Sequence, residues 1–347
     1  MTSDTTDVTP ALAVTGASVV LPPSPDGADG PGDGPPEDWF DYRSRLGPRG
    51  YKYLPAAAQY LLAAAREAAA GGSGLDAVPE DRRGSVLALN GALAGLFDRM
   101  DRQVALEGGA AGLSPATAPY FAVSVLGARL AAEHGLKGFA LTLASPGTAA
   151  LEAVEAGARA LYAGRCDSLF IGAAEHRLPK AAGEPGEQGA VALVLERQAA
   201  AEARGARVLG TCRAGSLFVP PRTLETEAGR ARLTALVGST LDRLLHGWAP
   251  EAPEVHYVLD DSAVAAQVRA AVDAAMRRPA AGAAALGAGT LTAAVRLADL
   301  LTGPPGDRLL VTAGARGHVA LALLRARPHP PHGAQAAPNP PHPREKN

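Results

Sequence analysis

The sequence predicts an α/β protein in which short, buried strands alternate with helices. Apolar segments of strand length recur along the chain, with Ala-rich segments of helical character between them. Residues 166–175 (CDSLFIGAAE) and 189–197 (GAVALVLER) stay apolar through their middle, which is typical of strands covered on both faces. A chain of 347 residues with 47% hydrophobic residues exceeds one typical core, so we expect two domains or two halves of one large domain.

The N-terminal half is expected to span residues 11–205. Its helices have local start and stop signals: Gly71 and Gly72 end the first one. Ser114 is suited to cap the next segment, with Pro115 at its first position, and Pro119 divides it into a short turn and a longer helix. Strands are predicted at 11–21, 84–93, 138–144, 166–175 and 189–197, and helices at 53–72, 147–163 and 198–205.

The C-terminal half, residues 206–326, repeats this pattern more weakly. Ser262 is placed to cap one of its helices. Strands are predicted at 206–218 and 254–261, helices at 225–246, 262–278 and 289–303, and a terminal hairpin at 308–326. Three segments are expected to lie outside this frame: a flexible N-terminus (1–10), a mobile Pro/Gly/Asp-rich loop (22–38) and a disordered Pro/His-rich tail (327–347).

Composition excludes several classes of function. The formal net charge of −2 argues against nucleic-acid binding, which needs a basic surface. Cys166 and Cys212 have no Cys or His neighbour at metal-ligand spacing, so neither a metal site nor a disulfide framework is expected. No dinucleotide fingerprint is present, and no cofactor is expected. There is no apolar run long enough to span a membrane and no signal peptide, so a cytoplasmic location is predicted.

The order of several segments resembles the β-ketoacyl synthase family of the thiolase superfamily. The resemblance rests on 14–20 (VTGASVV), 45–69, 113–175, 186–210 and 286–301 (LGAGTLTAAVRLADLL), and it spans Ala11 to Arg325. It implies a dimer with a five-layer α-β-α-β-α fold of two similar halves. Enzymes of this family join acyl chains to malonyl groups on acyl carrier protein. They use a Cys at the N-terminus of a buried helix, together with two His residues.

The same resemblance indicates that all three catalytic groups are missing here. The position of the Cys falls on Gly147. The segment after 254–258 reads LDDSAV and lacks the first His, and Ala284 stands where the second is expected. Chain-length factors, the β subunits of type II polyketide ketosynthases, also lack the Cys, usually carrying Gln there. The segment 119–138 and Ser145, two residues before Gly147, resemble them as well.

Family resemblance also suggests which residues shape the acyl tunnel and the dimer. Thr117, Tyr120 and Phe121 lie on a segment that borders the tunnel in the family, with ordinary core packing as the competing interpretation. In the family, the strand that corresponds to Phe139, Ala140, Leu141, Thr142 and Leu143 pairs across the dimer two-fold. An exposed apolar edge of this kind should also not stay unpaired.

The predicted function is therefore that of a ketosynthase-like subunit without condensing chemistry of its own. It would form a heterodimer with an active ketosynthase, help shape the tunnel in polyketide or fatty-acyl elongation, and act with acyl carrier protein. One alternative is an acyltransferase or hydrolase that uses Ser145 as nucleophile, which requires a base within hydrogen-bond reach. Another is a scaffold that binds carrier protein or synthase without shaping a tunnel. His256, His318 and the pair Asp260–Asp261 are expected to be structural.

Overall fold

A computed structural model describes residues 10–23, 39–70, 73–107, 109–176, 187–248, 252–277 and 279–328. The predicted flexible N-terminus (1–10), mobile loop (22–38) and disordered tail (327–347) lie almost entirely outside these described residues.

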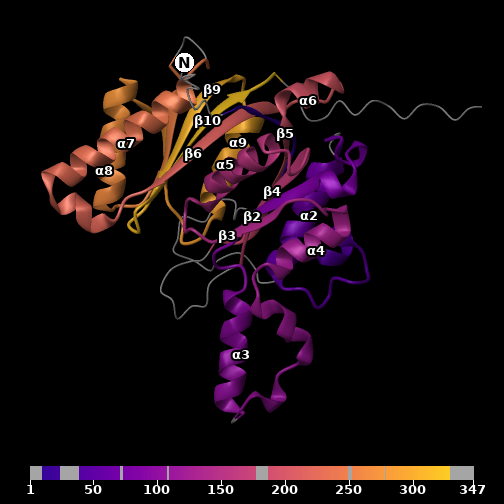
Figure 1. Ribbon diagram of the computed structural model, residues 1–347. Helices are drawn as coiled ribbons and strands as arrows, with labels where there is room; N and C mark the ends of the chain where they lie inside the picture. Colours follow the sequence, from indigo (N-terminus) through magenta and orange to yellow (C-terminus); the bar gives the residue numbers. More distant parts are fainter. Residues whose placement is uncertain are drawn as a thin grey trace, which may run out of the picture.

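The chain alternates strands and helices, as predicted, in two successive halves (Figure 1). The first half contains β1 (Leu12–Val20), α1 (Tyr42–Leu46), α2 (Ala56–Ala70), β2 (Arg83–Ala88), α3 (Ala94–Leu106), a 3₁₀ segment (Pro115–Phe121), α4 (Val125–His134), β3 (Ala140–Leu143), α5 (Ala149–Tyr162), β4 (Ser168–Glu175), β5 (Gly189–Arg197) and α6 (Gln198–Ala203). The second half contains β6 (Gly210–Phe218), α7 (Glu227–Leu245), β7 (Glu254–Leu259), α8 (Ala263–Met276), β8 (Ala280–Ala285), α9 (Leu291–Thr302), β9 (Gly306–Ala313) and β10 (His318–Ala326).

The strand order shows that the two halves share one topology. The strands lie in the order β3-β2-β4-β5-β1-β6-β10-β9-β7-β8. This order is symmetric about the β1–β6 junction, so that β1 corresponds to β6, β5 to β10, β4 to β9, β2 to β7 and β3 to β8. In each half one strand next to the sheet edge is parallel to both of its neighbours: β2 to β3 and β4, and β7 to β8 and β9. The remaining pairings are antiparallel. Among the described strands, the half-sheets join where Leu12–Val14 of β1 pairs with Gly210–Cys212 of β6.

Three hydrophobic cores define the layers. In the central core, α5 and α9 pack between the inner faces of the two half-sheets. The outer face of the first half-sheet is covered by α2 and α4, and that of the second by α7 and α8. The expected five-layer α-β-α-β-α arrangement of two similar halves is therefore confirmed, with the half-sheets continuous at the β1–β6 junction.

Small side chains allow α5 to lie between two sheets. Most of its buried residues are alanines, and a Cβ added to Gly157 would lie 2.4 Å from Leu169 Cδ2 of β4. The close approach of helix and strand therefore depends on the absence of a side chain at Gly157.

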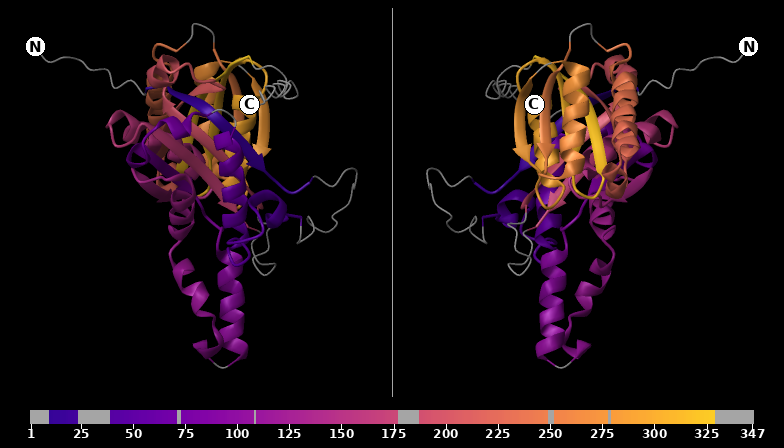
Figure 2. Two further views of the ribbon diagram at one scale, coloured as in Figure 1. Left: turned by 90° about the vertical axis from the view of Figure 1, so that its right-hand side faces the viewer. Right: turned by 90° about the vertical axis from the view of Figure 1, so that its left-hand side faces the viewer.

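Helix α3 and strand β8 were not predicted from the sequence, and neither was the short helix α1. Helix α3 and the segment that follows it project from the body as an arm (Figure 2). Its N-cap residue, Leu93, makes no side-chain cap hydrogen bond, so the usual polar start signal is absent. Strand β8 consists of alanines and one glycine, which have low β-propensity, and it owes its conformation to backbone pairing with β7.

None of the helices in the described ranges combines the length and the apolar character that crossing a bilayer requires.

Candidate functional site

Gly147 occupies the turn between β3 and α5, at the N-terminus of a helix in the central layer. Its backbone is in the left-handed region, with φ of 73°. The Gly147 N–H donates to the carbonyl oxygen of Gly289 at 2.9 Å. Gly289 lies just before α9, so this bond joins the starting turns of the two central helices.

The space above Gly147 is filled by a leucine from the other half of the chain. A Cβ added to Gly147 would lie 2.6 Å from Leu286 Cδ2 and 2.7 Å from Leu286 Cδ1. These separations are shorter than carbon atoms tolerate, so a cysteine at position 147 requires Leu286 to move. Leu286 also covers Gly314, where an added Cβ would lie 3.0 Å from Leu286 Cδ2.

Ser145 hydrogen-bonds to a carboxylate rather than to an imidazole. Its hydroxyl donates to Glu152 Oε2 at 2.8 Å, and the Thr148 hydroxyl donates to Glu152 Oε1 at 2.6 Å. His318 Nδ1 lies 3.7 Å from Glu152 Oε1. Glu152 stands in the first turn of α5, where a negative charge complements the helix dipole. Sequence reasoning missed Glu152, although an acid in the first turn of a helix is a recognisable signal.

Two carboxylates from the first half occupy the N-terminus of α9. Buried Glu175 accepts bonds from the backbone N–H groups of Asn90, Gly91 and Thr290, and from the Thr290 hydroxyl. Burial raises the pKa of Glu175, while these donors oppose that effect. Glu187 accepts bonds from the N–H groups of Leu291 (2.6 Å) and Thr292 (2.8 Å). The backbone donors that make a helix N-terminus an anion site are thus partly satisfied from within the chain.

The positions expected for the two His residues carry no imidazole. Ala284 lies on the exposed edge strand β8 between Ala283 and Ala285, so no neighbouring register supplies a His either. In the LDDSAV segment, Asp260 accepts bonds from the N–H groups of Ser262 (3.1 Å) and Ala315 (2.6 Å). That capping role agrees with the structural interpretation of the Asp260–Asp261 pair.

Neither cysteine offers a substitute nucleophile. Both are buried and free. Burial raises the pKa of the Cys166 thiol to about 11 and that of Cys212 to about 12, so both remain protonated near neutral pH. Within the ranges that the structure describes, no three or more His, Cys, Asp or Glu side chains gather in a way that could hold a metal ion.

The three predicted tunnel residues lie together on the 3₁₀ segment at the arm but differ in surroundings. Tyr120 is buried in the outer core of the first half. Phe121 is 66% exposed and stacks on Phe97 of α3, with ring centroids 6.1 Å apart. The Thr117 hydroxyl donates to the Ser114 carbonyl oxygen at 2.7 Å. Their tunnel role stays a prediction.

The strand predicted to pair across a dimer, β3, is an edge of the sheet. Leu141 is exposed, whereas Phe139 and Leu143 pack against the central core. A groove of about 720 Å³ runs between β3 and α4. Small or short side chains dominate its lining, which comprises Ser85, Ala122, Val123, Ser124, Gly127, Ala128, Ala131, Ala140, Leu141 and Thr142.

The family model of the β-ketoacyl synthase N-terminal domain matches residues 37–217, just over half of the chain. The chain belongs to the β-ketoacyl synthase family. The match covers β2, α4, β3, α5, β4 and β5, and therefore the turn that holds Gly147 and the cluster around Glu152.

Solved structures of ketosynthases share the fold of this family member at low sequence identity. One is the AntDE:AntF complex of a type II PKS acyl-carrier protein with its ketosynthase bound to the hexaketide: 16% identity, TM-score 0.70, covering 92% of this chain and 100% of that chain. Another is the ishigamide ketosynthase/chain length factor, with 20% identity and a TM-score of 0.66; the match covers 91% of this chain and 99% of that chain. A third is the ketosynthase from module 1 of the bacillaene synthase from Bacillus amyloliquefaciens FZB42, with 13% identity and a TM-score of 0.64; the match covers 95% of this chain and 75% of that chain. The search of curated protein sequences found no match.

Proposed function

We propose that this chain is a non-catalytic ketosynthase-like subunit of the chain-length-factor type. It pairs with an active β-ketoacyl-ACP synthase and helps to shape the acyl tunnel during polyketide or fatty-acyl elongation. The observation that carries this proposal is the contact between Leu286 and Gly147. At the helix N-terminus where the family resemblance places the nucleophilic Cys, this chain has no side chain, and a leucine fills the space.

The free edge of β3 supports pairing with a second chain. The carbonyl oxygens of Phe139 and Leu143 accept bonds from Ser85 and Leu89 on the β2 side. Because parallel strands alternate the direction of their backbone groups, Ala140 and Thr142 direct their N–H and C=O groups to the open side. An open edge of this kind is a template for another strand. The adjoining groove is lined by small residues that permit close backbone approach.

The proposed partners are a ketosynthase and an acyl carrier protein, because both kinds of protein occur in the similar solved structures. The ishigamide structure is a ketosynthase/chain length factor, and the AntDE:AntF structure contains an acyl-carrier protein with its ketosynthase. We infer that this chain likewise assembles with a ketosynthase and works with acyl carrier protein. The partner would provide the condensing Cys and both His residues, in the cytoplasm.

The pairing is tested by tagging the chain in its native host and identifying the protein purified with it. We expect a ketosynthase with an intact Cys in a one-to-one ratio. Ala128→Glu places a charge in the groove and should release that partner. Ala270→Glu, on an exposed position of outer helix α8, is the matched control and should retain it. A clean homodimer, or equal retention by both variants, would contradict the proposed pairing.

A second candidate function is an acyltransferase or hydrolase using Ser145. The hydrogen bond from Ser145 to Glu152, with His318 beside Glu152, is the observation that favours it. It requires Glu152 to act as a general base, and an acyl group must then be found on Ser145.

A further inference from the structure

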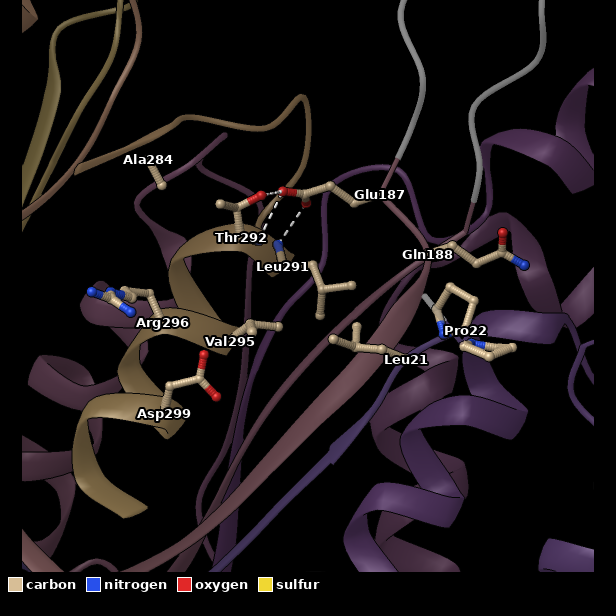
Figure 3. Close-up of a pocket in the computed structure, with 11 residues that line it drawn as sticks. Leu21, Pro22, Glu187, Gln188, Ala284, Leu291, Thr292, Val295, Arg296 and Asp299 are labelled. Carbon is tan, nitrogen blue, oxygen red and sulfur yellow. Dashed lines mark hydrogen bonds between the residues drawn. The ribbon is translucent and has the colours of Figure 1, made fainter. Parts of the chain in front are cut away.

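A cavity of about 540 Å³ lies beside α9, on the flank where the end of β1 faces β8 (Figure 3). Its volume falls in the range of small-molecule sites. One stripe of α9 forms much of the wall, because Leu291, Val295 and Asp299 follow each other at four-residue intervals. Leu21 and Pro22, which directly follow β1, stand opposite. The surface is predominantly apolar.

A cationic group stands at the rim of this apolar wall. Arg296 Nη2 lies 2.9 Å from Nδ1 of His256, which is only 6% exposed. Since a guanidinium can only donate, Nδ1 is the acceptor and the imidazole proton sits on Nε2. Burial, and then the charge of Arg296, lower the pKa of His256 and favour this neutral form. Gly282 leaves room for the pair, because a Cβ there would lie 2.8 Å from both interacting nitrogens.

The remaining hydrogen-bonding capacity of Arg296 is not used by acids in the described part of the chain. No carboxylate among those residues lies within ion-pair distance of its guanidinium. Glu187, at the top of the cavity, is already bonded to the first turn of α9. Asp299 lies near enough for the charge of Arg296 to act on it but makes no ion pair with it, and burial raises the pKa of the Asp299 carboxyl.

We propose that this cavity binds a linear acyl chain that ends in a carboxylate, with the chain along Leu21, Leu291 and Val295 and the carboxylate on Arg296. An apolar wall with one positioned guanidinium complements that class of amphiphile, since Arg forms paired hydrogen bonds to carboxylates. Neither Gly147 nor Leu286 lines this cavity, although Ala284, at the position expected for the second His, does. The proposal does not depend on the proposed role as a chain-length factor.

The test is isothermal titration calorimetry of the purified full-length protein, together with any partner that co-purifies, with decanoate and separately with decanol. Arg296→Gln removes the charge while its amide can still donate to His256 Nδ1. Arg232→Gln, on an exposed position of outer helix α7, is the matched control. We expect Arg296→Gln to weaken decanoate binding about tenfold or more, which corresponds to the loss of a hydrogen bond to a charged group. The affinity of Arg296→Gln for decanol, and that of Arg232→Gln for both probes, should stay unchanged.

A second pair of variants tests the apolar wall. Ala284 is exposed and lines the cavity, so Ala284→Trp should abolish binding of both probes without disturbing the core. Ala281→Trp, at another exposed position of β8, should leave binding intact. Circular dichroism establishes that each variant is folded. Absence of decanoate binding to the native chain overturns the proposal, as does equal affinity of Arg296→Gln and the native chain for decanoate.

Discussion

Leu286 packs directly on Gly147, although the two residues belong to different halves of the chain. A Cβ at position 147 would lie within 2.9 Å of three atoms of the leucine side chain. Glycine permits the left-handed backbone of the turn before α5, and Leu286 fills the space that a side chain would occupy. The contact also predicts how this turn responds to substitution.

Gly147→Ala should destabilise the protein by roughly 2–5 kcal/mol. Left-handed backbone disfavours a residue with a Cβ by about 1–2 kcal/mol, and overpacking against Leu286 adds about 1–3 kcal/mol. Leu286→Ala should relieve only the overpacking, so a double-mutant cycle in urea should show a favourable coupling. If Gly147→Ala unfolds at the same urea concentration as the native chain, the described packing of this turn is wrong.

Ser145→Ala should leave the activity of the assembled synthase unchanged. The hydroxyls of Ser145 and Thr148 both donate to Glu152. Thr148 is fully buried and therefore serves as the structural comparison for Ser145. A structural role predicts similar, modest losses of stability in Ser145→Ala and Thr148→Val, because each removes one bond to Glu152. The measurement is product formation together with mass spectrometry of the intact chain. An acyl adduct that disappears only in Ser145→Ala would favour the enzyme.

Phe121→Ala should lengthen the product or broaden its length distribution when the chain works with its ketosynthase. Phe121 is the suitable position because it is 66% exposed, so its truncation leaves the core intact, whereas Tyr120 is buried. Leu106→Ala, on an 85% exposed side chain at the end of α3, serves as control. Products are compared by mass spectrometry. An unchanged product from an intact complex would favour the scaffold interpretation over a tunnel role.

The stability of the protein should fall as pH drops below the ordinary His range, in part because of His134. Burial lowers the pKa of His134 from its ordinary 6.5, so the folded state keeps this ring neutral while the unfolded chain takes up a proton. The contribution of the neutral His134 ring to the free energy of unfolding is therefore complete above pH 6.5, and it is lost as pH falls below that value. His134→Phe preserves the ring contact with Phe170 and should flatten the pH dependence.

This prediction is tested by measuring the free energy of unfolding of the native chain and of His134→Phe between pH 8 and 5. Glu175 has a raised pKa, so its contribution to the free energy of unfolding is lost as pH rises. The pH dependence that it causes is opposite in sign to that of His134. The difference between His134→Phe and the native chain separates the two groups. Parallel pH profiles for the two chains would contradict the role given to His134.

Much of the fold is a local property of the sequence and was predictable from it. The uninterrupted apolar runs of β4 and β5 indicated strands buried on both faces, and both strands are fully covered apart from the last residue of β5. Ser262 caps α8 as predicted, accepting a bond from the Ala265 N–H at 3.2 Å. The absence of a Cys at Gly147 is likewise a fact of sequence. These features depend on residues a few positions apart, whose preferences act without the rest of the chain.

Other features were decided only by tertiary structure. Glu187 bonds the first turn of α9 from 104 residues away, and Leu286 closes the turn at Gly147 from the opposite half. The alanines of β8 have no strand preference and become a strand through pairing with β7, while His256 meets Arg296 only because β7 and α9 are adjacent. The sequence by itself determined most of the helices and strands, and it determined that positions 147 and 284 carry Gly and Ala. The packing of the two halves decided what fills the site and where a cavity remains, because contacts between distant segments depend on three-dimensional shape and have no local signature.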